Sequence, residues 1–359
     1  MRVIDLTDNR SGLEAFVVID HELFPVSVGG TRMLPDVDLQ EVARLARAMT
    51  WKLAACRIPY AGAKAGLRFS GGDRARLLDA YKHALQPYRD VFLTGPDMGT
   101  DPADFLEGHE DPLPLWAKSL DGLGMDDLAT GHGVKAAAEA GLRHLGRTLE
   151  GARVAIEGFG KVGAGAAWAC AGAGARIVAV STVDGLLADS GGLDVAELLE
   201  LRVRHGDRFV EHGSRPVGRR EELFELDCDV LVPGARPDSI TTAVAERVRC
   251  RVVAPAANVP YAAGAIETLH GRGIIAIPDF LSNSGGVHLY DTVAQDEQPA
   301  QALANIEAKV SDAIAGTLTT AGELGTTPYA AALRNVRDYL AEATGATGEV
   351  VDTLIPSAP

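Results

Sequence analysis

The sequence has few cysteines, a deficit of positive charge and no long apolar segment, and each shortage excludes a class of protein. The four cysteines are far apart and form no CxxC pair, so we expect reduced thiols, no metal site and a cytoplasmic protein. A formal net charge of −15 argues against nucleic acids and anionic membranes as partners. No stretch of about 20 residues is apolar enough to span a bilayer. The early charges of Arg2 and Asp5 predict no signal peptide.

The remaining composition is that of a globular protein with room for two hydrophobic cores. Hydrophobic residues make up 47% and charged residues 23% of the 359 residues. In the second half, strands alternate with helices, which predicts a parallel, doubly wound sheet. We expect strands over residues 16–20, 91–94, 153–157, 175–181, 229–232, 251–254 and 274–277. We expect helices over residues 38–52, 75–88, 133–145, 299–324 and 329–343. Asp38 and Glu41 would form a capping box for the first helix, and residues 212–222 an exposed loop.

A glycine-rich loop lies between the first strand of the second half and an Ala-rich helix. It consists of Gly158, Phe159, Gly160, Lys161, Val162 and Gly163. A second strand follows the helix, and this is the context that a dinucleotide-binding loop needs. Gly158 would permit the tight turn, Gly160 the approach of a pyrophosphate, and Gly163 close packing of helix on strand. The alternative is a packing turn that binds no ligand.

The end of the next strand bears on the choice between NAD and NADP. An acid there would bind the ribose hydroxyls of NAD, but Ser181 and Thr182 occupy that position and Asp184 comes late. Lys161 suits a pyrophosphate, a 2′-phosphate or a solvated surface equally. We therefore expect NAD or NADP as the cofactor, with NAD slightly favoured.

Lys52, Lys64 and Asp97 stand upstream of the glycine loop. Lys64 lies in an Ala-Gly run, where burial would lower the pKa of its amine into a range suited to proton transfer. Lys52 lies on the last turn of an expected helix and could hold a carboxylate, while Asp97 follows a strand and the rigid Pro96. Each residue alone is better explained as a snorkelling lysine or a helix cap. Together, before a dinucleotide loop, they indicate hydride transfer involving a small charged substrate.

At this point the chain resembles the glutamate/leucine/phenylalanine/valine dehydrogenase family, and the leucine/phenylalanine/valine branch more than the glutamate branch. The segments that carry the resemblance are residues 28–33, 49–52, 59–64, 95–100, 129–134, 256–258 and 282–287. The resemblance implies an α/β fold of two domains. Residues 1–128 would form a substrate-binding and oligomerisation domain, residues 129–324 a Rossmann-type NAD(P)-binding domain, and the helix within 325–359 would pack back on the first.

The resemblance also implies a reaction, the reversible NAD(P)-dependent oxidative deamination of an L-amino acid to a 2-oxo acid and ammonia by a homo-oligomer. The substrate would bind in the cleft between the domains. Lys64 would activate water for attack on the imino intermediate, Asp97 would exchange a proton with the amine, and Lys52 would bind the α-carboxylate. The implied cofactor-binding residues are Thr130, Gly158, Phe159, Gly160, Lys161, Val162, Gly163, Ser181, Thr182, Ala256, Ala257, Asn258 and Asn283.

The side-chain specificity can be predicted in part. Besides Lys52, the implied substrate-binding residues are Val28, Gly29, Gly30, Gly95, Val287 and Tyr290. Glutamate enzymes of the family have a lysine where this chain has Val28, and burying a second carboxylate without that charge is unfavourable. We therefore expect an apolar or aromatic L-amino acid. Tyr290 replaces a smaller residue and Ala61 and Ala63 replace glycines, so a specialised enzyme for an unusual amino acid of secondary metabolism is an alternative.

Two further alternatives belong to other functional classes. A non-catalytic nucleotide-binding paralogue would have no need of Lys52, Lys64 and Asp97. A 2-hydroxy acid dehydrogenase would need a His/Arg pair near its substrate, and the histidines of this chain show no matching motif.

Overall fold

The structure, a computed structural model, describes residues 1–106, 117–120, 122–292 and 298–355. The chain forms two compact units, of which unit 1 comprises Met1–Ala117 with Asn335–Ser357 and unit 2 comprises Lys118–Arg334. From the sequence we expect domain boundaries after residues 128 and 324 instead. The first boundary differs because helix α3 (Met125–His144) is continuous and lies wholly in unit 2. The second differs because the boundary falls within helix α11 (Pro328–Thr344).

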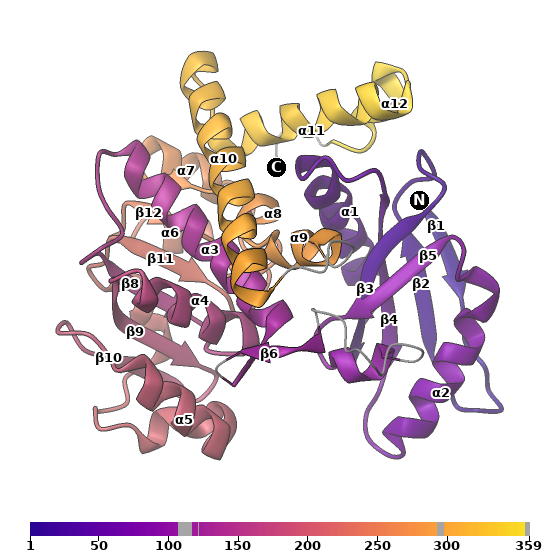
Figure 1. The fold of residues 1–359 in the computed structure, drawn as a ribbon, viewed down its shortest axis with the longest axis horizontal. Helices are drawn as coiled ribbons and strands as arrows, with labels where there is room; N and C mark the ends of the chain where they lie inside the picture. The colour runs from indigo at the N-terminus through magenta and orange to yellow at the C-terminus, as the bar shows by residue number, and fades with distance from the viewer. Residues whose placement is uncertain (107–116, 121, 293–297, 356–359) are drawn as a thin grey trace. The chain divides into compact units, whose positions relative to one another are not determined.

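The centre of unit 1 is a five-stranded sheet with the strand order β1-β2-β4-β3-β5 (Figure 1). Its strands are β1 (Arg2–Asp5), β2 (Ala15–Ile19), β3 (Ser27–Leu34), β4 (Ala61–Arg68) and β5 (Phe92–Pro96). Strand β3 runs parallel to β4 and β5, whereas β2 is antiparallel to β1 and β4. The carboxyl ends of β3, β4 and β5 therefore meet at one edge of the sheet.

Two helices cover the two faces of this sheet. Helix α1 (Leu39–Ala55) packs Val42 and Ala46 against Val18 on one face. Helix α2 (Arg74–Leu85) packs Tyr81 on the other face, where Ala63 is part of the same core. A short 3-10 helix, Gln86–Tyr88, follows α2.

Helix α1 lies very close to β4 because Gly62 has no side chain. A Cβ at Gly62 would lie 2.1 Å from the backbone nitrogen of Thr50 and 2.4 Å from the carbonyl oxygen of Ala46. The side chain of Asp38 caps the helix as predicted, since it accepts a hydrogen bond from the backbone N–H of Glu41 at 2.8 Å. The carboxylate of Glu41 does not complete the expected capping box, because it bonds to an arginine of β3.

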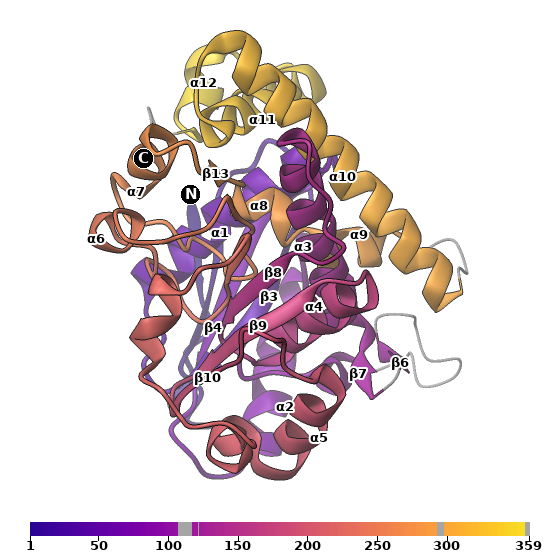
Figure 2. The same ribbon diagram turned by 90° about the vertical axis from the view of Figure 1, so that its left-hand side faces the viewer.

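Unit 2 contains a six-stranded sheet with the order β10-β9-β8-β11-β12-β13 (Figure 2). The strands are β8 (Arg153–Glu157), β9 (Arg176–Thr182), β10 (Gly185–Ala188), β11 (Val230–Pro233), β12 (Val252–Val253) and β13 (Ile275–Ala276). All pairings are parallel except that of β10 with β9. The predicted doubly wound, Rossmann-type architecture is confirmed.

The remaining elements of unit 2 are helices and one short ribbon. The helices besides α3 are α4 (Lys161–Gly172), α5 (Val195–His205), α6 (Thr242–Ala245), α7 (Ala265–Gly271), α8 (Asp279–Ser282), α9 (Gly285–Thr292) and α10 (Pro299–Leu324). Strands β6 (Ser119–Leu120) and β7 (Leu123–Gly124) form the ribbon before α3. The expected loop over 212–222 overlaps two 3-10 helices, Gly206–His212 and Arg220–Glu225.

Helix α3 begins at Met125, well before the position 133 expected from the sequence. Two glycines in this part of the helix serve helix packing rather than a break. A Cβ at Gly131 would lie 2.3 Å from the carbonyl carbon of Gly165 in α4, and one at Gly133 would lie 3.0 Å from the carbonyl oxygen of Ser282. Tertiary contacts thus override the low helix propensity of glycine.

Strand β5 also extends beyond its expected end, through Gly95 and Pro96. Proline lacks a backbone N–H and is tolerated here because β5 is an edge strand. Asp97 then follows the strand directly, as expected.

The C-terminal residues of the described chain pack on α1. The indole nitrogen of Trp51 donates a hydrogen bond to the carbonyl oxygen of Leu354 at 2.9 Å, just after helix α12 (Gly348–Asp352). In the described residues, no helix has the length and apolar character needed to cross a membrane.

Candidate active site

Lys64 and Asp97 meet on one face of the sheet in unit 1. Strand β3 separates β4 from β5, and Gly30 of β3 is paired with Gly95 of β5. Across this gap the Nζ atom of Lys64 lies 2.9 Å from Oδ1 of Asp97. The side chains are only 5% and 15% exposed, so their ion pair is largely removed from water.

The surroundings of this pair shift both pKa values. Burial lowers the pKa of Lys64; the charge of Asp97 opposes this shift and that of Arg32 adds to it. For Asp97, burial acts to raise the pKa, but the positive charges of Lys64 and Arg32 outweigh it and hold that pKa well below its usual range. The lowered pKa of Lys64 brings its amine closer to the range in which proton transfer is efficient, and Asp97 is ionised and so able to accept a proton.

Two glycines let β3 pack closely beside the pair and within the sheet. A Cβ at Gly30 would lie 2.6 Å from the carbonyl oxygen of Pro96, 3.0 Å from Cβ of Asp97 and 3.3 Å from Nζ of Lys64, so Gly30 avoids a clash with the segment that carries Asp97. A Cβ at Gly29, on the other face, would lie 1.7 Å from the carbonyl oxygen of Ala63, so Gly29 is required for the sheet itself. Val28 pairs with Gly62 and is half-buried on the same face as Lys64.

Buried hydroxyl groups fix the turn that carries Asp97. The backbone N–H of Asp97 donates to Oγ1 of Thr100 at 2.8 Å, and that hydroxyl donates to the carbonyl oxygen of Thr31 at 2.9 Å. The hydroxyl of Thr31 in turn bonds to those of Tyr81 and Thr94 at 2.7 and 2.8 Å. The carboxylate is therefore held by the core that α2 forms with the sheet.

Two departures noted in the sequence lie away from this face. Side chains alternate along a strand, so Ala61 and Ala63 point to the α2 side and Lys64 to the α1 side. Both methyl groups are fully buried. They do not crowd the Lys64–Asp97 pair.

Lys52 lies on the last turn of α1, as expected, and is 7% exposed. Arg32 was not among the residues expected in the site. Its Nε atom donates to Oδ2 of Asp97 at 2.9 Å, and its other end bonds to Glu41. The only sequence signal for Arg32 is its position two residues after Gly30, which places it on the same face of β3.

The glycine loop of unit 2 has the geometry expected of it. Gly158 has a φ of +82°, which favours glycine. A Cβ at Gly163 would lie 1.9 Å from the carbonyl oxygen of Gly158, so only glycine permits this packing. Gly160 is the N-cap residue of α4 and has no side chain to cap it. Apart from Gly160 itself and its neighbours along the chain, no atom of the described residues lies within 4 Å of a Cβ at Gly160.

The N-terminus of α4 at Gly160 thus leaves room for a ligand, and a helix N-terminus suits a pyrophosphate. Lys161 is exposed and Val162 half-buried beside it. The Phe159 side chain is instead in the core, 1% exposed, with its ring centroid 5.2 Å from that of Phe209. Only the backbone of Phe159 is available to a ligand.

The end of β9 lies under this loop. The carbonyl oxygen of Ser181 accepts hydrogen bonds from the backbone N–H groups of Gly158 and Phe159. The hydroxyl of Thr182 donates to the carbonyl oxygen of Asp207 at 3.0 Å and accepts from the N–H of Asp184 at 3.1 Å. Both side chains are buried, and the acidic residues around this strand end include Glu157, which pairs with Ser181, and Asp184, which follows the strand.

Asn283 brings the late cofactor candidates together. Its Nδ2 atom donates to the carbonyl oxygens of Ala256 and Ala257 at 3.3 and 3.0 Å and to Oδ1 of Asn258 at 3.1 Å. Its own Oδ1 is buried and bonds to no described residue. A buried acceptor of this kind suits a donor group on a ligand.

Thr130 lies on α3 near the start of α9. A Cβ at Gly286 would lie 3.1 Å from Oγ1 of Thr130, and this hydroxyl donates to the carbonyl oxygen of Asp126 at 3.0 Å. Val287 and Tyr290 follow on α9, three residues apart and so on one face. Tyr290 is 43% exposed, and desolvation and the Asp126 charge raise the pKa of its hydroxyl. The predicted substrate residues therefore form two sets, Val287 and Tyr290 in unit 2 and the others in unit 1.

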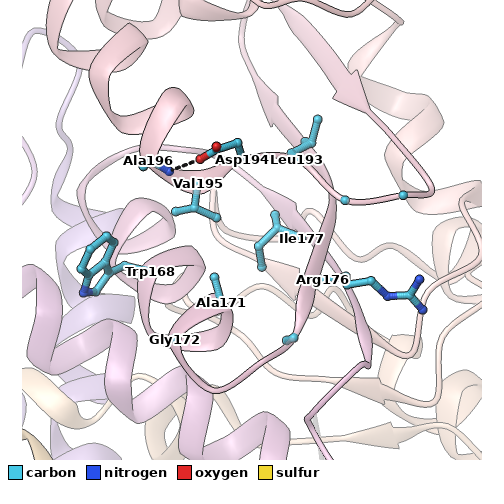
Figure 3. Close-up of a pocket in the computed structure, with 12 residues that line it drawn as sticks. Trp168, Ala171, Gly172, Arg176, Ile177, Leu193, Asp194, Val195 and Ala196 are labelled. Carbon is cyan, nitrogen blue, oxygen red and sulfur yellow. Dashed lines mark hydrogen bonds between the residues drawn. The ribbon is translucent and has the colours of Figure 1, made fainter.

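A separate groove in unit 2 contains none of the candidate residues (Figure 3). It has a volume of about 490 Å³ and is lined by Trp168, Arg176, Ile177, Asp194 and neighbouring residues. It lies where β9 begins, whereas the glycine loop lies where β9 ends.

Comparison with known proteins identifies the family. The Glutamate/Leucine/Phenylalanine/Valine dehydrogenase family profile matches residues 122–348. The chain belongs to this family. The Glu/Leu/Phe/Val dehydrogenase dimerisation domain profile matches residues 2–106, so the two matches fall largely on the two units.

Individual relatives include glutamate dehydrogenase A2 of Halobacterium salinarum, which is 35% identical over 279 residues. The match covers 72% of this chain and 66% of the relative, slightly under two thirds of its length. A hetero-hexameric glutamate dehydrogenase of Thermus thermophilus, in a Leu-bound form, superposes with a TM-score of 0.81 at 28% identity, covering 95% of this chain and 88% of that one.

The L-tryptophan dehydrogenase of Nostoc punctiforme has a TM-score of 0.66 at 23% identity, covering 96% of this chain and 97% of its own. At that identity the likeness shows the fold alone. The expected placement in the leucine/phenylalanine/valine branch of the family is not confirmed, because the relatives matched by sequence are glutamate dehydrogenases.

Proposed function

We propose that the chain is an NAD(P)-dependent amino acid dehydrogenase that catalyses the reversible oxidative deamination of an L-amino acid to the 2-oxo acid and ammonia. The observation that carries this proposal is the buried pair of Lys64 and Asp97, whose charged atoms lie 2.9 Å apart next to Gly30 of β3. A non-catalytic nucleotide-binding paralogue would gain nothing from this pair, since burying ionised groups opposes folding.

Asp97 and Lys64 would share the proton transfers. Asp97, held ionised, takes a proton from the substrate ammonium so that the free amine donates electrons to Cα. Lys64, as a neutral amine, takes a proton from the water that attacks the imine carbon, and as a cation it stabilises the oxygen that forms there. Lys52 binds the α-carboxylate by its charge and orients Cα. Each proton transfer of this kind contributes about 10²–10⁴-fold to a rate.

The cofactor would bind to unit 2. When bound, NAD(P) accepts the hydride that leaves the substrate Cα. The N-terminus of α4 at Gly160 would hold the pyrophosphate, with Lys161 and Val162 beside it, and Asn283 would offer its buried Oδ1. Ala256, Ala257 and Asn258 would line the same region through backbone and amide groups.

We propose NAD as the preferred form. The strand end that would receive the adenosine ribose is followed by Asp184, and a carboxylate there would repel a 2′-phosphate. The nearby Arg208, on which the charge of Asp184 acts, bonds to Glu211 at 2.8 Å. Titration of protein fluorescence with NAD and with NADP measures this preference directly, and tighter binding of NADP would contradict it.

We further propose an apolar or aromatic amino acid as the substrate. Val28 occupies the sheet face of Lys64 and offers no charge to a distal carboxylate, and Gly95 keeps the adjoining position of β5 open. Val287 and Tyr290, which lie on α9, remain proposed substrate-binding residues. The glutamate dehydrogenases among the relatives make glutamate the competing candidate, and a specialised enzyme for an unusual amino acid is a second alternative.

Exchange of Val28 tests this specificity. Val28→Lys supplies the missing charge and should raise the kcat/KM for glutamate relative to leucine by at least about tenfold, whereas Val28→Met, of similar length without the charge, should not. Equal effects of the two exchanges, or a wild-type protein that prefers glutamate, would refute the role given to Val28.

We also propose that the protein is a cytoplasmic homo-oligomer. The match of residues 2–106 to a dimerisation domain supports a homo-oligomer, and analytical ultracentrifugation would measure the number of subunits. The four cysteines lie in described parts of the chain and form no disulfide, which supports a reducing cytoplasm.

A further inference from the structure

Arg32 is a buried cation that no role in the proposed reaction uses. It lies on β3, its side chain is 6% exposed, and it bonds to two carboxylates at once. Its Nε donates to Oδ2 of Asp97 at 2.9 Å, and Nη1 donates to Oε1 of Glu41. With Lys64 on Oδ1 of Asp97, the four side chains form a chain of alternating charge.

The position of Glu41 supports a functional rather than a local role. Its backbone N–H is bonded to the cap residue Asp38, which leaves its carboxylate free to complete a capping box. The carboxylate extends instead to Arg32. The Glu41 carboxylate thus holds Arg32 next to Asp97 instead of forming the second hydrogen bond of a capping box at the start of α1.

We propose that Arg32 and Glu41 are positioning residues for the reaction: Arg32 occupies Oδ2 of Asp97 so that only Oδ1 faces Lys64 and the substrate, and Glu41 holds Arg32 in place. The inference rests on the proposed function, because it assigns these residues to that reaction. Neither residue needs to touch the substrate.

The geometry has a consequence for ionisation. The charges that act on Lys64 come from Asp97 after β5, Arg32 on β3 and Glu41 on α1. Arginine stays protonated at all relevant pH values, so the positive charge of Arg32 disfavours the protonated form of Lys64. The negative charge of Glu41 favours that form. Removing Arg32 should therefore raise the pKa of Lys64, and removing the charge of Glu41 should lower it.

This opposition gives a signed test. Arg32→Met should shift the pH profile of Lys64 reactivity upward by about one pH unit. At a fixed pH below the pKa, the fraction of Lys64 in the neutral amine form should then fall about tenfold. Glu41→Gln should shift it downward by less, because the Glu41 side chain is 34% exposed and solvent screens its charge. Arg32→Lys keeps the charge but cannot fork to two carboxylates, so its profile should stay near that of the wild type while kcat falls.

Two readouts separate this inference from the proposed function. The first is the rate of Lys64 acetylation by acetic anhydride as a function of pH, measured by peptide mass spectrometry on the full chain without substrate. The second is the pH dependence of kcat/KM with the best amino acid. Arg68→Met, which removes a more exposed arginine of β4 bonded to Glu14, is the matched control and should move neither profile.

Opposite shifts in Arg32→Met and Glu41→Gln, in folded proteins of measured Tm, support the proposal. Shifts in the same direction, or a fall in Tm with no change of either profile, would show a structural role only and overturn it. The two variants could also show opposite acetylation shifts in a protein that oxidises no amino acid. That result would confirm the ionic coupling of Arg32 and Glu41 to Lys64, but it would contradict both the dehydrogenase reaction and the positioning role in it.

Discussion

Replacement of Asp97 by asparagine should abolish turnover and also destabilise the protein. The carboxylate has two acceptor oxygens, and each is bonded to a buried cation, Lys64 on Oδ1 and Arg32 on Oδ2, both at 2.9 Å. An asparagine amide offers one acceptor and one donor. Both cations lose the charge of Asp97, although Arg32 keeps that of Glu41, and one of them must also face an NH₂ group. This loss costs about 3–5 kcal/mol. For a unit of this size, that lowers Tm by roughly 10 °C.

The assay compares thermal unfolding and turnover of the wild type, Asp97→Asn and Glu14→Gln. Glu14 forms an exposed ion pair with Arg68, so its exchange should change Tm very little, whereas kcat of Asp97→Asn should fall about 10²–10⁴-fold. The difference in Tm between wild type and Asp97→Asn should also depend on pH. The folded-state pKa of Asp97 lies below the ordinary 3.8, so its contribution is present above that value and is lost as the pH falls below it. An Asp97→Asn protein as stable and as active as the wild type would refute the reasoning.

Two other exchanges test the packing and the cofactor loop. Gly62→Ala should lower the unfolding free energy by about 1–3 kcal/mol, because the new methyl would lie 2.1 Å from the backbone of α1. Gly316→Ala on α10 should raise it by about 0.5–1 kcal/mol, because no described atom outside the adjoining helix backbone lies within 4 Å of the new methyl. Similar values for both exchanges would contradict the close approach of α1. Gly160→Ala should leave Tm nearly unchanged yet weaken NAD binding about tenfold or more, and an unchanged Kd by fluorescence titration would place the pyrophosphate elsewhere.

Much of the architecture follows from local sequence patterns. The alternation of apolar strands and helices predicts the sheet of unit 2, and the spacing of Gly158, Gly160 and Gly163 predicts a turn, an open helix terminus and a close contact, all of which the structure contains. Asp97 directly after a strand and Lys52 on a last helical turn were also predictable. These features depend on residues that are neighbours in the chain.

Other features depend on partners that are distant in sequence. Strand β4 is rich in alanine and glycine, which have low strand propensity, yet it pairs with β2 and β3, and α1 packs closely on its Gly62. The sequence predicts that helix α3 starts at residue 133, whereas it starts at Met125, and its Gly131 is required by the contact with α4. Arg32 gains its significance only when folding brings Glu41 and Asp97 to its two ends.

The most direct test of the central proposal follows reduced-nicotinamide absorbance after the purified protein is mixed with NAD or NADP and a panel of L-amino acids at alkaline pH. The account predicts that reduced nicotinamide forms only with both cofactor and amino acid present, fastest with an apolar or aromatic one, and that Lys64→Ala and Asp97→Asn lose this activity while still binding the cofactor. Absence of reduction with every amino acid, in a wild-type protein that binds the cofactor, would contradict it.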